Sequence, residues 1–95
     1  MKYKITLAVN GEEYDGEGET ITEAIDATGL HFTDVKTKGT ITIKDGKYEI
    51  QKFFLARQIK KLFNSSLVRK FWPNDMEKMF KIMKEKKLFK KEIGL

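Results

Sequence analysis

The spacing of apolar residues changes halfway along the chain, and this change constrains the fold more than any other feature of the sequence. In residues 3–9, large apolar side chains alternate with polar or small ones, which predicts a half-buried β-strand. Asn10-Gly11 follows at once and favours a type I′ turn, because both residues tolerate positive φ. The alternation returns in residues 40–50 around Asp45-Gly46, so we expect a second hairpin there.

A short helix is predicted between the two hairpins. Thr20 and Glu23 have the spacing of a capping box, in which the threonine hydroxyl accepts the Glu23 amide proton and the Glu23 side chain reaches back. Apolar residues within 21–25 then share one helical face, and Gly29 is a natural stop. The first half of the chain therefore predicts the order ββαββ.

This order resembles that of β-grasp domains, the ubiquitin-like shape. The resemblance rests on residues 5–11 (ITLAVNG) and 19–25 (ETITEAI), and it implies a β-grasp-like sheet for residues 1–50. The whole chain also resembles, in its Lys/Glu-rich style, the short proteins that phages and mobile elements encode.

A helical period replaces the alternation in residues 51–95. Positions 55, 59, 62 and 63 form one amphipathic stripe, and Asn64-Ser65-Ser66 is expected to end that helix. A second short helix is predicted over residues 67–72. Pro73 is expected to end it, because the residue before a proline is pushed away from helical dihedrals.

A third helix is predicted after Asn74 or Asp75. Its apolar stripe weakens after Glu85, so the last residues are expected to fray. We therefore predict an α+β protein, in which an N-terminal ββαββ (β-grasp-like) sheet is followed by two or three amphipathic basic helices. Residues 1–95 are expected to form a single domain, with a sheet half (1–50) and a helical half (51–95).

Charge divides the chain at the same place. Residues 1–50 contain 6 Lys and 10 Asp or Glu, a net charge of −4, whereas residues 51–95 contain 13 Lys or Arg and 4 Asp or Glu, a net charge of +9. A half this basic meets an acidic partner or lies against its own acidic half. There is no cysteine, which excludes disulfides and thiolate metal sites. No apolar run predicts a signal peptide or a membrane span, so we expect a soluble cytoplasmic protein, with the virion as a second location.

Residues that could carry catalysis are few. His31 is the one histidine and Asp34 could orient it, but a loop histidine beside a solvated aspartate is the simpler interpretation. The acidic residues of 12–19 lack the spacing of a calcium loop. Gly16-x-Gly18 lacks the Lys-Ser/Thr of a phosphate loop, so we interpret it as a flexible strand end. We therefore predict no catalytic residue, cofactor, metal or small-molecule substrate, and no enzyme activity.

The basic helices are the main candidates for function. One hypothesis is a non-catalytic interaction or assembly protein whose helices dock on a protein partner or on a second copy. The alternative is a nucleic-acid-binding module that uses the basic face of residues 52–91. Both hypotheses use one set of predicted contact residues: Arg57, Lys60, Lys61, Arg69, Lys70, Trp72, Met79, Phe80 and Met83.

Each part of this set also has a simpler interpretation. The lysines could form a solvated face, and the aromatic and methionine side chains could belong to the core. We favour a protein partner because the helices carry more apolar surface than one small sheet is expected to bury.

Overall fold

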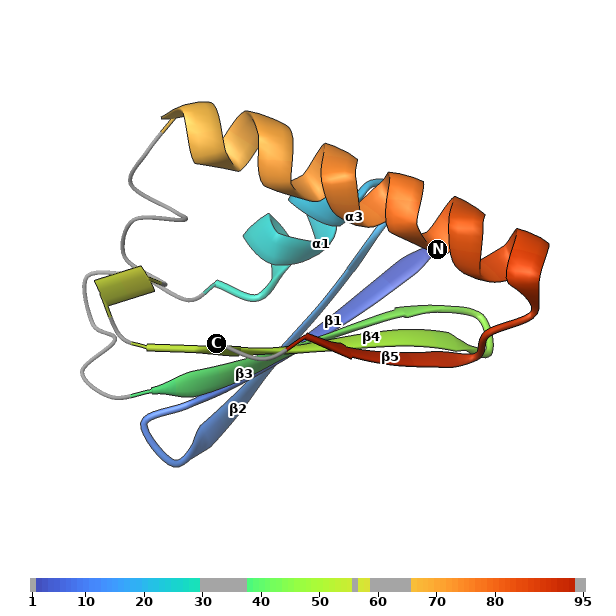
Figure 1. Ribbon diagram of the computed structural model, residues 1–95. Coiled ribbons are helices and arrows are strands. Elements are labelled where there is room, and N and C mark those ends of the chain that lie inside the picture. The colour runs from blue at the N-terminus through green and yellow to red at the C-terminus, as the bar shows by residue number, and fades with distance from the viewer. Residues whose placement is uncertain (1, 30–37, 56, 59–65, 94–95) are drawn as a thin grey trace.

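Five strands and two helices make up the described part of the chain. The computed structural model describes residues 2–29, 38–55, 57–58 and 66–93, with the backbone alone for residues 66–70. Its elements are β1 (Tyr3–Val9), β2 (Glu12–Gly18), α1 (Ile21–Ala27), β3 (Gly39–Asp45), β4 (Tyr48–Phe54), α3 (Ser66–Lys86) and β5 (Lys90–Ile93). Both helices lie on the same side of the sheet (Figure 1). The predicted α+β class is confirmed.

The strands form one mixed sheet in the order β2-β1-β3-β4-β5. Neighbouring strands are antiparallel except β4 and β5, which are parallel and joined through α3. A parallel pair needs a long crossover connection, and α3 supplies it. The basic half of the chain therefore contributes an edge strand to the sheet that the acidic half begins.

Both predicted hairpins are present. Asn10 and Gly11 have φ of 54° and 75°, the positive values that a type I′ turn requires. In the second hairpin the loop residues are Gly46 and Lys47, one position later than the Asp45-Gly46 pair indicated. Gly46 has φ of 62° at the first loop position, where a type II′ turn places its positive φ.

The core lies between the sheet and the two helices. Alternate residues of β1 and β3 point inward, as the period of two predicts, and the other face of the sheet carries no described helix. The buried side chains of the core are Tyr3, Ile5, Leu7, Val9, Ile21, Ala24, Ile25, Ile41, Ile43, Ile50, Phe54, Met76, Phe80 and Met83.

α1 begins with the predicted capping box. The Glu23 amide donates to the Thr20 hydroxyl at 3.1 Å, and the Glu23 carboxylate accepts from the Glu19 amide at 3.0 Å. The helix packs directly on β2 at two buried glycines. A Cβ added at Gly16 would overlap the Ala24 carbonyl oxygen and lie 2.8 Å from the Thr28 nitrogen. Gly16 is therefore a contact point for α1, and its interpretation as a flexible strand end is wrong.

α3 is one continuous helix where the sequence predicted a break. Pro73 lies inside it, although a proline in a helix interior costs about 3 kcal/mol. Three buried side chains, Met76, Phe80 and Met83, continue the stripe beyond the proline, and burial of each contributes roughly 1.5–3 kcal/mol. Trp72, just before the proline, packs against the same core, so one continuous helix keeps the stripe in phase on both sides of Pro73 and offsets the cost of the proline. The predicted helix end at Pro73 is wrong, and the two helices of the described residues are α1 and α3. The first helix predicted after the sheet, over positions 55–63, falls largely outside the described residues.

The end of α3 is closed by two backbone hydrogen bonds. Lys87 takes φ of 55°, its amide donates to the Lys84 carbonyl at 3.4 Å, and the Leu88 amide donates to the Met83 carbonyl at 2.9 Å. This pattern is the Schellman motif, in which a residue of positive φ turns the chain away from the helix.

β5 follows this turn and was not predicted. Its residues pair with β4 from Glu49↔Lys90 to Lys52↔Ile93, instead of fraying as a weak helical end. Three of its four residues are charged, so its side chains show no strand pattern. The segment is a strand because its backbone pairs with β4. The segment 51–95 is therefore not purely helical.

We expect Gly16→Ala to destabilise the protein by at least about 1–3 kcal/mol, because the added methyl group meets the backbone of α1. Urea denaturation monitored by circular dichroism measures this change. Glu17→Ala is the matched control, since Glu17 is exposed on the same strand and should change the midpoint little. A Gly16→Ala midpoint equal to that of the control would contradict the direct packing of α1 on β2.

Candidate partner-docking groove

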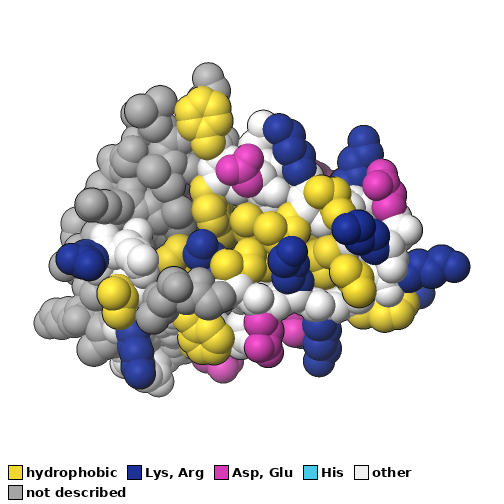
Figure 2. Space-filling model, viewed as in Figure 1, with side chains coloured by type: hydrophobic (Ala, Val, Ile, Leu, Met, Phe, Trp, Pro, Cys, Tyr) yellow, Lys and Arg dark blue, Asp and Glu magenta, His cyan; other side chains and the backbone are white. Residues whose placement is uncertain are grey.

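A groove of about 220 Å³ runs between α3 and β5. Figure 2 shows this face of the molecule, with a band of apolar side chains in its middle and basic side chains across and beside the band. The groove is lined by Asp75, Lys78, Met79, Ile82, Met83, Lys86, Leu88 and Lys91. We call this set the α3–β5 groove.

The period of α3 explains how the groove forms. Phe80 and Met83 point toward the sheet and are each 1% exposed, whereas Met79 and Ile82 lie one residue away on the side toward β5. Ile82 is 50% exposed and Leu88, just after the helix, is 51% exposed. The apolar stripe of α3 is therefore wider than the sheet covers, and its uncovered margin forms the groove.

Positive charge surrounds this apolar margin. The charged residues of the lining are Lys78, Lys86 and Lys91 with Asp75, a net charge of +2. Lys78 and Lys86 lie two turns apart on α3, and Lys91 lies across the groove on the inner face of β5, beside Ile50 of β4. The groove therefore offers ammonium groups on both of its sides.

The second hairpin holds the C-terminal end of α3 in place. The Lys84 ammonium lies 2.6 Å from the carboxylate of Asp45, whose side chain is 11% exposed. The Glu49 amide donates to the Phe89 carbonyl at 2.8 Å, and the Phe89 ring stacks on Tyr48 with centroids 5.3 Å apart. The Lys84–Asp45 contact also neutralises part of the basic half against the acidic half.

The basic residues predicted as contacts are described only in part. Arg57 is exposed and helical. Lys60 and Lys61 lie outside the described residues, and Arg69 and Lys70 lie in α3 with side chains outside the description. The basic patch predicted from them stays a prediction.

The apolar residues of the predicted set are separated by the structure. Met79 lines the groove and Met83 forms part of its buried floor, whereas Phe80 is in the core beneath it. Trp72 is half-buried, and its ring meets Phe54 edge-on at 6.2 Å. Phe80 and Met83 therefore pack against the sheet, on the face of α3 that was predicted to contact a partner, and Met83 also borders the groove.

Sequence reasoning missed most of the groove lining: Asp75, Lys78, Ile82, Lys86, Leu88 and Lys91. Ile82 and Lys86 are four residues apart beside the methionine stripe, a signal that marks the margin of the helix face. Lys91 had no such signal, since its place depends on the pairing of β5 with β4.

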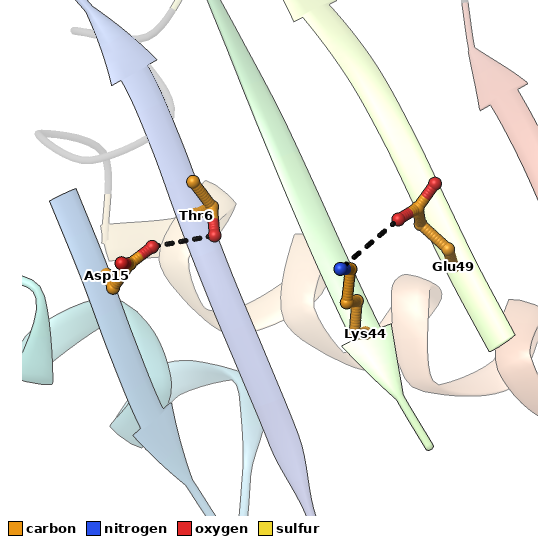
Figure 3. A network of polar contacts seen from close by, with 4 residues as sticks. All are labelled: Thr6, Asp15, Lys44 and Glu49. Atoms are coloured by element: carbon orange, nitrogen blue, oxygen red, sulfur yellow. Dashed lines mark hydrogen bonds and ion pairs between the residues drawn. The ribbon is translucent and has the colours of Figure 1, made fainter. Parts of the chain in front are cut away.

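The uncovered sheet face offers a polar surface instead. There the Thr6 hydroxyl donates to Asp15 at 2.7 Å, and the Lys44 ammonium lies 3.7 Å from Glu49 (Figure 3). Exposed pairs of this kind contribute about 0–1 kcal/mol to stability, as expected for a face of the sheet that is in contact with solvent.

A separate hollow of about 450 Å³ lies near Thr40 and Phe54, and Lys38 is the charged residue among its described lining.

The side chains that commonly bind metal ions lie apart from one another in the described residues. No group of three or more His, Cys, Asp or Glu side chains gathers there in a way that could hold a metal ion. His31 and Asp34 lie outside the described residues. The Tyr3 side chain, through its hydrogen bond and charge interaction, raises the pKa of Lys2, so this ammonium is no base at neutral pH.

The chain matches no protein-family model, no curated protein and no solved structure. Within the described residues, neither helix combines the length and apolar character that crossing a membrane demands.

We expect Lys84→Met to destabilise the protein by about 1–2 kcal/mol, because the poorly exposed Asp45 carboxylate loses its cation. The magnitude is modest because the Lys84 side chain is itself 42% exposed to solvent. Urea denaturation in a buffer without added salt measures this change in stability. Lys81→Met, at an exposed position on the same helix, is the control and should be near neutral. Equal midpoints for the two variants would show that the Lys84–Asp45 contact does not hold α3.

Proposed function

We propose that this protein is a non-catalytic interaction protein that docks on a protein partner through the α3–β5 groove. One observation carries the proposal: Ile82 and Leu88 are half-exposed at the floor and side of a groove that Lys78, Lys86 and Lys91 surround. An exposed apolar surface with a polar rim is typical of a protein interaction site.

The chemistry of the partner follows from how much each kind of contact in the groove can contribute to binding. Burying the exposed halves of Ile82 and Leu88 contributes about 1 kcal/mol each, which is too little for binding by itself. Carboxylates that reach the rim ammonium groups add about 0.2–1 kcal/mol per pair. The groove therefore fits an acidic amphipathic helix whose apolar side chains recur at i and i+4 and whose flanks carry Glu or Asp.

Nucleic-acid binding is the alternative for the same surface. Rim lysines would contact phosphates without reading sequence. Aliphatic side chains such as Ile82 and Leu88, however, do not provide the flat rings on which bases stack. The apolar content of the groove thus favours a protein. The ββαββ order of residues 3–54 is compatible with the β-grasp-like scaffold that we propose for the first half.

A designed peptide tests the proposal. The probe is an amphipathic helix with Leu at i, i+4 and i+7 and Glu on its flanks, and its counterpart has Lys in place of Glu. We expect the acidic peptide alone to shift the amide resonances of residues 78–91 in an NMR titration of the labelled protein. Replacing both Ile82→Ser and Leu88→Ser should weaken binding about tenfold or more.

The matched control is Phe53→Ser, which removes a side chain that is 45% exposed on the opposite face of the sheet. It should leave peptide affinity unchanged. Lack of binding by the acidic peptide would overturn the proposal. Salt-dependent binding of DNA or RNA oligonucleotides that survives the Ile82→Ser, Leu88→Ser double change would favour the nucleic-acid alternative.

A further inference from the structure

The two edges of the sheet carry opposite charge. β2 and β5 are the outermost strands, and no described strand pairs with the outer side of either. Residues 12–18 contain four carboxylates and no cation, a net charge of −4. β5 and the turn that leads into it, residues 87–93, contain Lys87, Lys90, Lys91 and Glu92, a net charge of +2. All of these charged side chains are exposed.

This arrangement discriminates between ways of joining two copies. Pairing β2 with β2 would set carboxylates opposite one another, and pairing β5 with β5 would do the same with ammonium groups. Directly opposed like charges destabilise a strand pair, whereas each opposite pair contributes about 0.2–1 kcal/mol. The one favourable combination joins the acidic edge of one copy to the basic edge of the next.

We propose that a second copy of this chain adds its β2 strand to the outer edge of β5, so that the sheet continues from one molecule into the next. The contact is head-to-tail, and each added copy still presents one free acidic edge and one free basic edge. Such a contact generates a ring if its rotation closes and an open filament if it does not.

Charges facing each edge from its own molecule set how strong the contact is. On the acidic edge Glu17 lies opposite Lys4 of β1, and Asp15 accepts the Thr6 hydroxyl proton, which leaves Glu13 opposite the uncharged Ala8. On the basic edge, Lys90 lies opposite Glu49 of β4. β5 has only four residues, so few backbone hydrogen bonds can form. Association is therefore weak and depends on low ionic strength.

Lysines on a short edge strand commonly prevent strand addition. Here they repel another basic edge but attract the acidic edge that the same chain carries. This contact goes beyond the proposed function, because it uses the outer edge of β5 and not the groove between β5 and α3.

Charge reversal at each edge tests the contact. One variant combines Lys87→Glu with Lys90→Glu, and so has two acidic edges. The other combines Glu12→Lys, Glu13→Lys and Glu17→Lys, which changes the net charge of residues 12–18 from −4 to +2, and so has two basic edges. Sedimentation velocity over a range of concentrations, at about 0.02 M and about 0.5 M salt, reports association. We expect wild type to associate at the lower salt and to dissociate at the higher salt.

Each variant alone is expected to be monomeric, and an equimolar mixture of the two should associate again, because every junction between unlike variants is attractive. The control, Lys44→Glu with Lys81→Glu, changes the net charge as much as the first variant at exposed positions away from both edges and from the groove, and should still associate. A monomeric wild type at every concentration, or a mixture that stays monomeric, would overturn the inference. Peptide binding in the groove would be unaffected by either result, so the two proposals fail separately.

Discussion

The burial of one side of α3 is the contact on which the rest of this structure depends. Met76, Phe80 and Met83 pack on the sheet beside β4, where Phe80 also meets Tyr3 of β1, and α1 covers β2 and β1 on the same face. Because this stripe stays in phase through Pro73, the helix remains whole despite the backbone hydrogen bond that the proline removes. The length of α3 then decides where the chain emerges, and so where β5 can pair with β4.

The proposed function depends on the surfaces that this packing leaves uncovered. A helix stripe wider than its sheet leaves Ile82 exposed, and the return of the chain brings Leu88 and Lys91 to its other side. The same return creates a basic edge strand opposite the acidic β2 edge. The groove and the basic edge therefore arise from the crossover β4–α3–β5, whereas the acidic edge belongs to the ββαββ segment that precedes it.

Local features of the sequence predicted the first half of the fold well. Period-two alternation, Asn10-Gly11 and the Thr20/Glu23 cap each act within a few residues, so the sequence carries the whole signal. The second half depended on tertiary effects. Pro73 marks a helix end by local rules, and only burial of the stripe overrides them. The charged β5 segment has no strand pattern, since its structure comes from the edge that β4 offers. The groove was missed for the same reason.

Amide hydrogen exchange at residues 74–76 tests the continuity of α3 most directly. In one helix, these amides donate to the carbonyls of residues 70–72 across the proline. If a new helix began after Pro73, they would be among its first amides and would have no helical partner. The account predicts that the amides of Asn74, Asp75 and Met76 exchange as slowly as those of residues 77–80. Exchange of all three at the rate of an unstructured peptide, with residues 78–86 protected, would contradict it.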